Sequence, residues 1–511
     1  MDTVNRVIKN TGFLYGKMGI TMFISLLNTR LILNSLGVSD FGVFNVVGGA
    51  IAMLGFLNGA MTSATQRFMS FAEGEGNLQK LKHIFNVSII LHSLIAIVVG
   101  IVLLIAGHFF FNGLLNISSD RIHAAHVIYY FMIISTMITV MTVPYEAVLN
   151  AHENMLYFSI VGIIESLLKL IVAIVVVYVM ADKLIIYGAL MAGVSLIVMF
   201  IMRIYTHKHY IECVFAPGIY WDKTIMKKMT GFAGWNFLSA STSVFSQYGL
   251  SIVLNNFFGT ILNAAQGIAN QINGQLMAFS NTMMKALNPV IAKSEGKGDR
   301  TLMLDASLIG SKFSYMLVVF FSIPFIIETP YILHIWLKNV PDWAILFARL
   351  QLLRSMIEQL TLIFNRTIDA EGRIKNYSII KSIINILPIV LTIILFYMGF
   401  APYYLYITWI FCWGIMGGIV TLYFSNKQCG LSYLKYFKVV VKPDLLLSSI
   451  MLLSGLLPVV FMEQSFVRLC IVIAITSAAF ILSNWLLILS DMEKKFISGL
   501  FLKIKQKINN K

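Results

Sequence analysis

Charged side chains occur inside several long stretches of the sequence that are otherwise apolar. Basic residues predominate among them, and the set consists of Lys17, Arg30, Glu165, Lys169, Lys312, Arg349, Arg354, Glu358 and Lys381. A charge at the centre of a membrane helix costs about 2.5 to 3.5 kcal/mol, so it is expected to pair, to bind a ligand or to act in ion transfer. Lys and Arg favour an anionic ligand, and the planar guanidinium group matches the oxygens of a phosphate.

Two pairs of these residues have the spacing of neighbours on one face of a helix. Glu165 lies four residues before Lys169, and Arg354 lies four residues before Glu358. Side chains at this spacing can form an ion pair, which would neutralise both charges without any ligand. We keep a second interpretation open, in which Glu165 and Glu358 couple transport to the movement of H+ or Na+.

The basic residues predict a cationic cavity that binds the substrate. Lys17 lies close to an expected helix end, where a lysine can extend its ammonium group to the membrane surface. Arg30, Lys312 and Arg354 are harder to explain in this way, because each lies well inside an apolar stretch. The candidates for the cationic cavity are Arg30, Lys312, Arg354, Lys17 and Lys169.

Amide side chains gather in two neighbouring stretches, one of which reads NAAQGIANQINGQLMAFSNTMMK (263–285). An unpaired polar group that faces lipid costs several kcal/mol, so this stretch must face water or protein. Amides suit a sugar-binding surface, and they also join helix to helix, so both uses remain open. The candidates for a polar cavity are Gln247, Gln266, Asn270, Gln271 and Asn273.

The sequence carries no catalytic or metal-binding motif. The stretch GFLYGKMG (12–19) has three residues between its glycines and Met after the Lys, whereas a phosphate-binding loop has four and then Ser or Thr. The four cysteines are dispersed, without the spacing of a zinc site. Glu328 and His334 lie on one connection but lack a clustered nucleophile. We expect no enzymatic activity, no metal and no cofactor.

Membrane helices are the elements that must position these side chains. The chain has 511 residues, of which 58% are hydrophobic and 12% charged, and its mean hydropathy is +0.82. Apolar stretches recur along the whole length, and each can cross a hydrocarbon core of about 30 Å as a helix. We predict an all-α integral membrane protein with about fourteen transmembrane helices.

Basic residues fall on alternate connections between the expected helices. The C-terminal tail and the even-numbered connections carry about 27 of the Lys and Arg residues and the odd-numbered ones about four, so both termini are expected in the cytoplasm. The net charge of +15 is then explained by topology and by a face towards anionic lipid. Nucleic acid is not an expected partner.

A polar pentapeptide occurs twice in the sequence. Residues 73–77 read EGEGN and residues 295–299 read EGKGD, and each follows the second helix of an expected group of six. Similar segments at 149–160 and 368–379 keep the same order. Because six is an even number, both groups enter the membrane from the same side, which makes a parallel repeat.

The repeat divides the chain into three parts. We expect an N-terminal six-helix lobe at 1–222, a C-terminal six-helix lobe at 223–428, and two further helices with a basic cytoplasmic tail at 429–511. Paired lobes of this kind are typical of transporters, in which a central cavity opens alternately to each side of the membrane.

Three segments carry a resemblance to a known family: LILNSLGVSDFGVFNVV (31–47), SATQRFMSFAEGEGNLQKL (63–81) and PYEAVLNAHEN (144–154). With the repeat and the helix count, the sequence resembles the polysaccharide transporter or O-antigen flippase family of the multidrug/oligosaccharidyl-lipid/polysaccharide exporter superfamily. The resemblance implies a flippase that moves an undecaprenyl-pyrophosphate-linked oligosaccharide from the inner to the outer leaflet. The oligosaccharide would be a repeat unit of O-antigen, capsule or exopolysaccharide.

The resemblance also implies a location and partners. These are the bacterial cytoplasmic (inner) membrane, its lipids, and the glycan polymerase and chain-length proteins of polysaccharide or lipopolysaccharide biosynthesis. One alternative is a cation-coupled multidrug or metabolite exporter of the same superfamily, against which the basic bias argues, because cationic substrates call for acidic residues. A membrane glycan polymerase or acyltransferase is a weaker alternative, because the expected outer connections are short.

Overall fold

The computed structural model of the protein describes residues 2–52, 55–111, 121–337, 339–491 and 493–494. Across these ranges the backbone is mostly helical and forms no β-strand. Many of the helices are apolar enough to lie in a membrane, so the predicted all-α membrane class is confirmed. Most of the predicted basic tail lies outside the described residues.

Eleven helices in the described ranges are long and apolar enough to cross a membrane. Three further predicted spans are helical, but their hydropathy is too low for them to be among these eleven. They fall in α2 (Gly55–Glu75), α9 (Thr260–Gly296) and α11 (Ala344–Leu362). Their Gln, Asn, Ser and Arg side chains lower the hydropathy of these helices. The arrangement agrees with the prediction of about fourteen transmembrane helices.

The chain divides into two compact units whose boundaries do not follow the sequence halves. The first unit comprises Met1–Val244, Lys285–Met303 and Arg366–Ser382, and the second comprises Phe245–Met284, Leu304–Asn365 and Ile383–Lys511. The ends of α9 and of α12 (Phe364–Glu371) therefore belong to the first unit, although they lie in the second half of the sequence. The predicted lobe boundaries near residues 222 and 428 stay a prediction.

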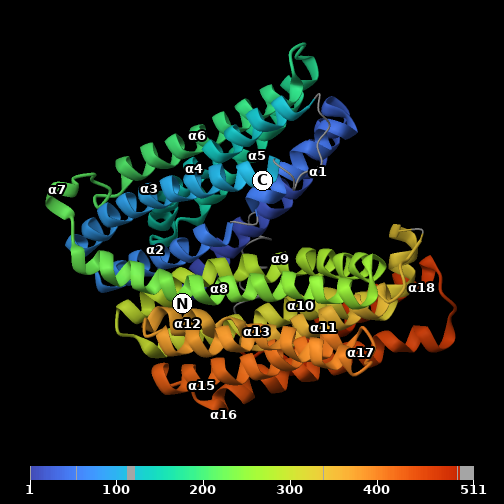
Figure 1. Cartoon of the computed structure of the whole chain (residues 1–511). Coiled ribbons are helices and arrows are strands. Elements are labelled where there is room, and N and C mark those ends of the chain that lie inside the picture. Colours follow the sequence, from blue (N-terminus) through green and yellow to red (C-terminus); the bar gives the residue numbers. More distant parts are fainter. Residues whose placement is uncertain (1, 53–54, 112–120, 338, 492, 495–511) are drawn as a thin grey trace, which may run out of the picture. The chain divides into compact units, whose positions relative to one another are not determined.

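The first unit is built mainly from α1 (Asp2–Ala52), α2, α3 (Leu78–Phe109), α4 (Ile122–Ala151), α5 (Met155–Tyr178) and α6 (Lys183–His209). α3, α4 and α6 run side by side, and α1 packs along α5 (Figure 1). In their core the Tyr129 hydroxyl donates a 2.6 Å hydrogen bond to the Leu103 carbonyl. The Tyr129 ring lies against Gly107, and the missing side chain there lets α3 and α4 approach closely.

Charged side chains hold one end of the first unit together. α1 bends at Gly37, whose φ of 79° is a conformation that glycine adopts without strain, and the chain continues as a helix on both sides of this kink. Arg121 donates to Asp40 just after the kink (Nε–Oδ1 2.7 Å) and to Asp182 (Nη1–Oδ2 2.8 Å). Asp182 also caps the N-terminus of α6 by accepting two backbone amides.

The second unit contains most of α10 (Arg300–Leu337), then α11, the end of α13 (Lys375–Tyr397), α14 (Tyr404–Trp409), α15 (Gly417–Cys429), α17 (Lys442–Phe461) and α18 (Phe466–Ser483). A π-helical turn, Ile410–Met416, joins α14 to α15. Phe347, Tyr406 and Trp409 form the centre of its aromatic core. The remaining helices are α7 (Pro217–Tyr220), α8 (Lys223–Phe258), which contributes to both units, and α16 (Tyr433–Tyr436).

A buried ion pair fixes α18 against the kink of α10. Arg468 makes a two-pronged contact with Glu328, with Nε–Oε1 and Nη2–Oε2 distances of 2.8 and 3.0 Å, and the side chains are 7% and 0% exposed. Glu328, which the polymerase alternative would have used with His334, is therefore occupied by a structural partner.

Replacing Arg468 with Gln is expected to lower the free energy of unfolding by about 3 to 5 kcal/mol, because it leaves a buried carboxylate unpaired. Thermal unfolding of the protein purified in detergent measures this loss. The control is Lys435→Gln, which breaks a pair with Asp305 whose side chains are 49% and 41% exposed. Because exposed pairs contribute little, an equal loss in both variants would contradict the role of Arg468.

Candidate functional site

The repeated pentapeptides end α2 and α9, and their last two residues have the same role in both copies. Gly76 and Gly298 have φ angles of 68° and 76°, which end each helix in the left-handed conformation that glycine adopts without strain. Asn77 and Asp299 follow, and each side chain accepts the backbone amide three residues later, at 3.0 and 2.9 Å. The pentapeptide therefore stops one helix and caps the next.

The first glycine of each pentapeptide allows α2 and α9 to cross. A Cβ on Gly74 would overlap the carbonyl oxygen of Lys293, and a Cβ on Gly296 would overlap that of Phe71. Phe71 and Lys293 each stand three residues before their glycine, so the contact is reciprocal and follows the symmetry of the repeat. Only glycine lets two helix ends approach this closely. We call this contact the glycine crossing.

Two cations tie the glycine crossing to the turns that follow α4 and α12. Arg67 of α2 donates from Nε to the Asp369 carbonyl (3.1 Å) and from Nη2 to the Ala370 carbonyl (2.9 Å). Lys293 of α9 donates to the Ala151 carbonyl (3.4 Å). Ala151 and Ala370 occupy matching positions of the repeat, so each half of the sequence binds the turn of the other.

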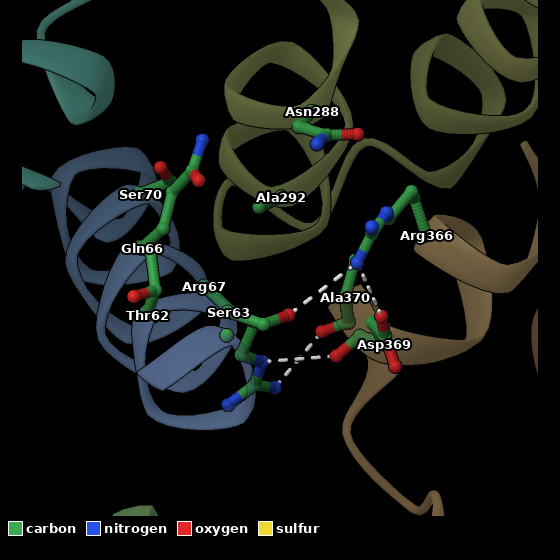
Figure 2. Close-up of a pocket in the computed structure, with 11 residues that line it drawn as sticks. Thr62, Ser63, Gln66, Arg67, Ser70, Asn288, Ala292, Arg366, Asp369 and Ala370 are labelled. Atoms are coloured by element: carbon green, nitrogen blue, oxygen red, sulfur yellow. Dashed lines mark hydrogen bonds and ion pairs between the residues drawn. The ribbon is translucent and has the colours of Figure 1, made fainter. Parts of the chain in front are cut away.

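A polar cavity of about 180 Å³ lies beside the glycine crossing, between α2, α9 and α12 (Figure 2). Its lining includes Arg67 and Arg366, and Arg366 Nη1 lies 3.2 Å from Oδ2 of Asp369. Burial raises the pKa of the Asp369 carboxyl, and attraction to Arg366 and Arg67 opposes this rise only in part. The cavity therefore carries a positive balance of charge.

A second group of ionisable side chains gathers around the ring of Phe158 on α5. The ammonium nitrogens of Lys17 on α1 and Lys285 on α9 lie 4.3 and 4.0 Å from the centroid of this ring. The Lys17 side chain rests against Gly162, where a Cβ would overlap it. Glu146 on α4 attracts both ammonium groups. We call Lys17, Glu146 and Lys285 the lysine–glutamate cluster.

Three of the predicted charged residues lie in or next to this cluster. Lys17 belongs to it, and Glu165 and Lys169 act on Lys17 electrostatically from α5. Glu165 and Lys169 form the ion pair expected from their spacing, at 2.6 Å, with side chains 38% and 37% exposed. Arg30 lies elsewhere on α1 with an exposed side chain. Binding and coupling roles for these residues stay predictions.

The two predicted cations of the second unit are held by protein groups. Lys312 is buried and donates to Glu493 at 3.0 Å and to the backbone carbonyl of Ile488. Arg354 contacts Glu358 at 2.5 Å, and its guanidinium carbon lies 4.2 Å from the centroid of the Trp409 ring. These contacts offset the cost of burying the charges. A role of Arg354, Lys312 or Glu358 in a cavity stays a prediction.

The amide residues divide between two environments. Asn273 accepts a 2.6 Å hydrogen bond from a serine of α11, which joins helix to helix. Gln266 is buried, Asn270 is half-buried, and Gln247 and Gln271 are exposed. The structure therefore uses Asn273 for packing, and a polar surface for substrate stays a prediction for the exposed ones.

Sequence reasoning missed Glu146, Lys285, Arg67 and Arg366 as members of charged sites. Glu146 lies in the segment PYEAVLNAHEN and Lys285 ends the amide-rich stretch, so both were visible as charges beside apolar residues. What the sequence could not show is that α1 and α9 bring two lysines to one aromatic ring, where Glu146 of α4 attracts both.

Comparisons with known proteins place the fold among transporters. The MatE family model matches residues 17–175, which is less than half of the 511 residues. A structure of MATE in the bent conformation matches with a TM-score of 0.72 and 14% identity, over 84% of this chain and 96% of that chain. An outward-facing multidrug resistance MATE family transporter of the MOP superfamily matches with a TM-score of 0.71 and 12% identity, over 83% and 95%.

A third similar structure is a MOP superfamily transporter from Pyrococcus furiosus, described as having a binding pocket of reversed polarity, with a TM-score of 0.67 and 12% identity over 83% and 95% of the chains. No functionally curated protein matches the sequence. The protein is thus a multi-pass membrane protein with the fold of MATE transporters, which are not enzymes.

These comparisons correct the predicted family. The resemblance to polysaccharide transporters and O-antigen flippases is wrong, because the matching family model is MatE and the similar structures are MATE multidrug transporters. They also give no support for a lipid-linked oligosaccharide, a glycan polymerase or chain-length proteins as partners. The segments at 31–47 and 63–81 that carried the resemblance contain the kink of α1 and the α2 side of the glycine crossing, and neither of these features contacts a substrate.

Proposed function

We propose that the protein exports an organic solute, a drug-like compound or a metabolite, by alternating access driven by the movement of H+ or Na+. The similarity of fold to MATE transporters supports transport as the activity. The lysine–glutamate cluster is the observation that carries the ion coupling, because it joins three helices through ionisable groups inside membrane segments. Such an exporter needs no cofactor.

The cluster offers a direct way for an ion to alter helix packing. When Glu146 is ionised, it attracts Lys17 of α1 and Lys285 of α9. Proton binding to Glu146, or Na+ binding beside it, weakens both attractions at once. The two lysines then repel each other across the Phe158 ring, and α1 and α9 are released from α4. An ion at one carboxylate thereby biases the arrangement of three helices.

A movement of α9 that starts at Lys285 also acts on the glycine crossing, because α9 carries both Lys285 and Gly296. We place the protein in a bacterial inner membrane with both termini in the cytoplasm, following the positive-inside rule. In this orientation the crossing lies on the cytoplasmic side and closes the path to that side. Separation of α2 and α9 then opens it.

The test is an export assay in a bacterial strain that lacks its major efflux pumps. Cells that express the protein are loaded with fluorescent compounds of positive, zero and negative charge, and retention is measured before and after an ionophore collapses the H+ or Na+ gradient. We expect lower retention of at least one compound and loss of the difference after collapse. Unchanged retention of every compound, with the protein present in the membrane, would overturn the proposal.

A further inference from the structure

The polar cavity beside the glycine crossing has no role in the proposed ion coupling, yet it has the features of a binding site. It is formed by α2, α9 and α12, so its lining comes from segments about 70 to 300 residues apart in the sequence. Figure 2 shows the side chains of Arg67 and Arg366 close to Asp369 and the amides of Gln66 and Asn288 on the other side of the space.

In residues that line the cavity, several buried polar atoms have no hydrogen-bond partner among the described residues. They are Nε2 of Gln66, Oγ of Ser70 and Oδ1 of Asn288, and Ser70 is fully buried. Gln66 and Ser70 stand four residues apart on one face of α2. Buried polar atoms without partners lose their hydrogen bonds to water and gain none in exchange. Such a group of atoms therefore indicates a bound ligand or bound water.

The types of these atoms indicate an anion. The Gln66 amide nitrogen and the Ser70 hydroxyl are donors, and reversal of the Asn288 amide, whose oxygen and nitrogen are assigned by fit, offers a third donor. Arg366 keeps donors beyond its contacts with Ser63 and Asp369, which use Nη1 alone. Arg67 and Arg366 outnumber the one carboxylate, Asp369, so a cation is disfavoured.

We propose that this cavity binds a phosphate or sulfate group between Arg366 on one side and the amides of Gln66 and Asn288 on the other, with Ser70 on the same helix face as Gln66. The volume of about 180 Å³ accommodates one such tetrahedral group with bound water. The bound group bridges α2, α9 and α12 and thereby stabilises the glycine crossing. The same chemistry can come from a soluble phosphate or from a lipid headgroup.

Thermal unfolding of the full-length protein in neutral detergent tests the site with inorganic phosphate as the probe, against chloride at equal ionic strength. Phosphate is expected to raise the melting temperature of the unmodified protein in a saturable way. Ser70→Ala should weaken the apparent affinity about tenfold, and Arg366→Gln by more, because each removes a hydrogen bond to a charged ligand.

The matched control is Arg373→Gln, since Arg373 lies in the turn after α12, has a 72% exposed side chain and is outside the cavity lining. It should keep the full response to phosphate. Absence of a saturable shift in the unmodified protein, or an equal shift in the Ser70→Ala variant, would overturn the proposal. The readout is binding, so this result is independent of whether the protein exports any compound.

The source of the group is decided in lipid nanodiscs. Phosphatidic acid in phosphatidylcholine discs, without inorganic phosphate, should stabilise the protein if the headgroup is the ligand. Inorganic phosphate added to pure phosphatidylcholine discs should do so if the ligand is soluble. Stabilisation in either arm that is reduced in the Ser70→Ala variant supports the proposal, and no stabilisation in both arms overturns it.

Sulfate as a probe adds a test of charge, because its own charge is constant over the range used. Asp369 is the carboxylate that opposes the anion, and the charged groups acting on it are Arg366 of its own helix and Arg67 of α2. Protonation of Asp369 removes a repulsion, so the affinity for sulfate should rise as the pH falls from about 8 to about 5.5. An affinity that falls over this range would place the anion away from Asp369.

Discussion

Replacement of Glu146 with Gln is expected to abolish ion-coupled export while the protein remains folded in the membrane. The neutral amide keeps the size of the side chain but removes the charge that attracts Lys17 and Lys285. The loss should exceed about tenfold in rate, because an ionisable group inside a membrane segment is worth more than 1.4 kcal/mol of differential interaction. Proteoliposomes energised by a pH or Na+ gradient measure the rate, and quantified protein in the membrane corrects for expression.

Glu165, the coupling candidate from the sequence, is compared with Glu146, because it is a carboxylate of the same unit that is 38% exposed and paired with Lys169 on its own helix. Glu165→Gln should retain export within about twofold, because an exposed pair contributes little. A second readout separates coupling from folding: the Glu146→Gln variant should still unfold cooperatively in detergent but lose the effect of the gradient on export. Gradient-driven export at the unmodified rate in this variant would remove Glu146 from the coupling site.

Replacement of Gly74 or Gly296 with Ala is expected to destabilise the protein and to stop export. Each new methyl group would overlap a backbone carbonyl of the facing helix, which cannot move out of the way as a side chain can. The cost is expected to be at least about 1 to 3 kcal/mol for each variant, as for other overpacked contacts. Export should fail because α2 and α9 can no longer close together.

Because the contact at the crossing is reciprocal, the variant with both glycines replaced can be compared with the two single variants. Once one methyl group has separated α2 and α9, the second meets no carbonyl, so the double variant should lose much less stability than the sum of the two single losses. The control is Gly231→Ala in α8, where nothing lies within 4 Å of the added carbon. It should be neutral or slightly stabilising, by about 0.5 to 1 kcal/mol. Additive losses at Gly74 and Gly296 would contradict a shared contact.

The predicted fold was confirmed but the predicted family was wrong, and the residues behind the resemblance explain this difference. In the segment at 63–81, Arg67 binds the end of α12 and Gly74 lets α2 and α9 cross. Gly76 ends α2, and Asn77 caps the helix that follows. These roles concern helix ends and contacts between helices, and none of them involves a substrate. A resemblance that rests on such residues therefore cannot select a substrate.

The charged residues show the same division between what is local and what is distant. The pairs Glu165 with Lys169 and Arg354 with Glu358 were predictable, because helical spacing alone places each pair on one face. The partners of Lys312 could not be predicted, since Glu493 lies 181 residues away in sequence. For the same reason the sequence could not show that Lys17 and Lys285 meet at one ring and share the attraction of Glu146.

The sequence by itself determined the membrane class, the approximate helix count and the repeated order of the helices, because hydropathy and helix-ending residues act over a few turns of one segment. Only the tertiary structure decided why EGEGN and EGKGD carry their first glycines, which charges share a site, and where a cavity forms. Those features depend on contacts between segments hundreds of residues apart, and such contacts leave no periodic pattern in a single chain.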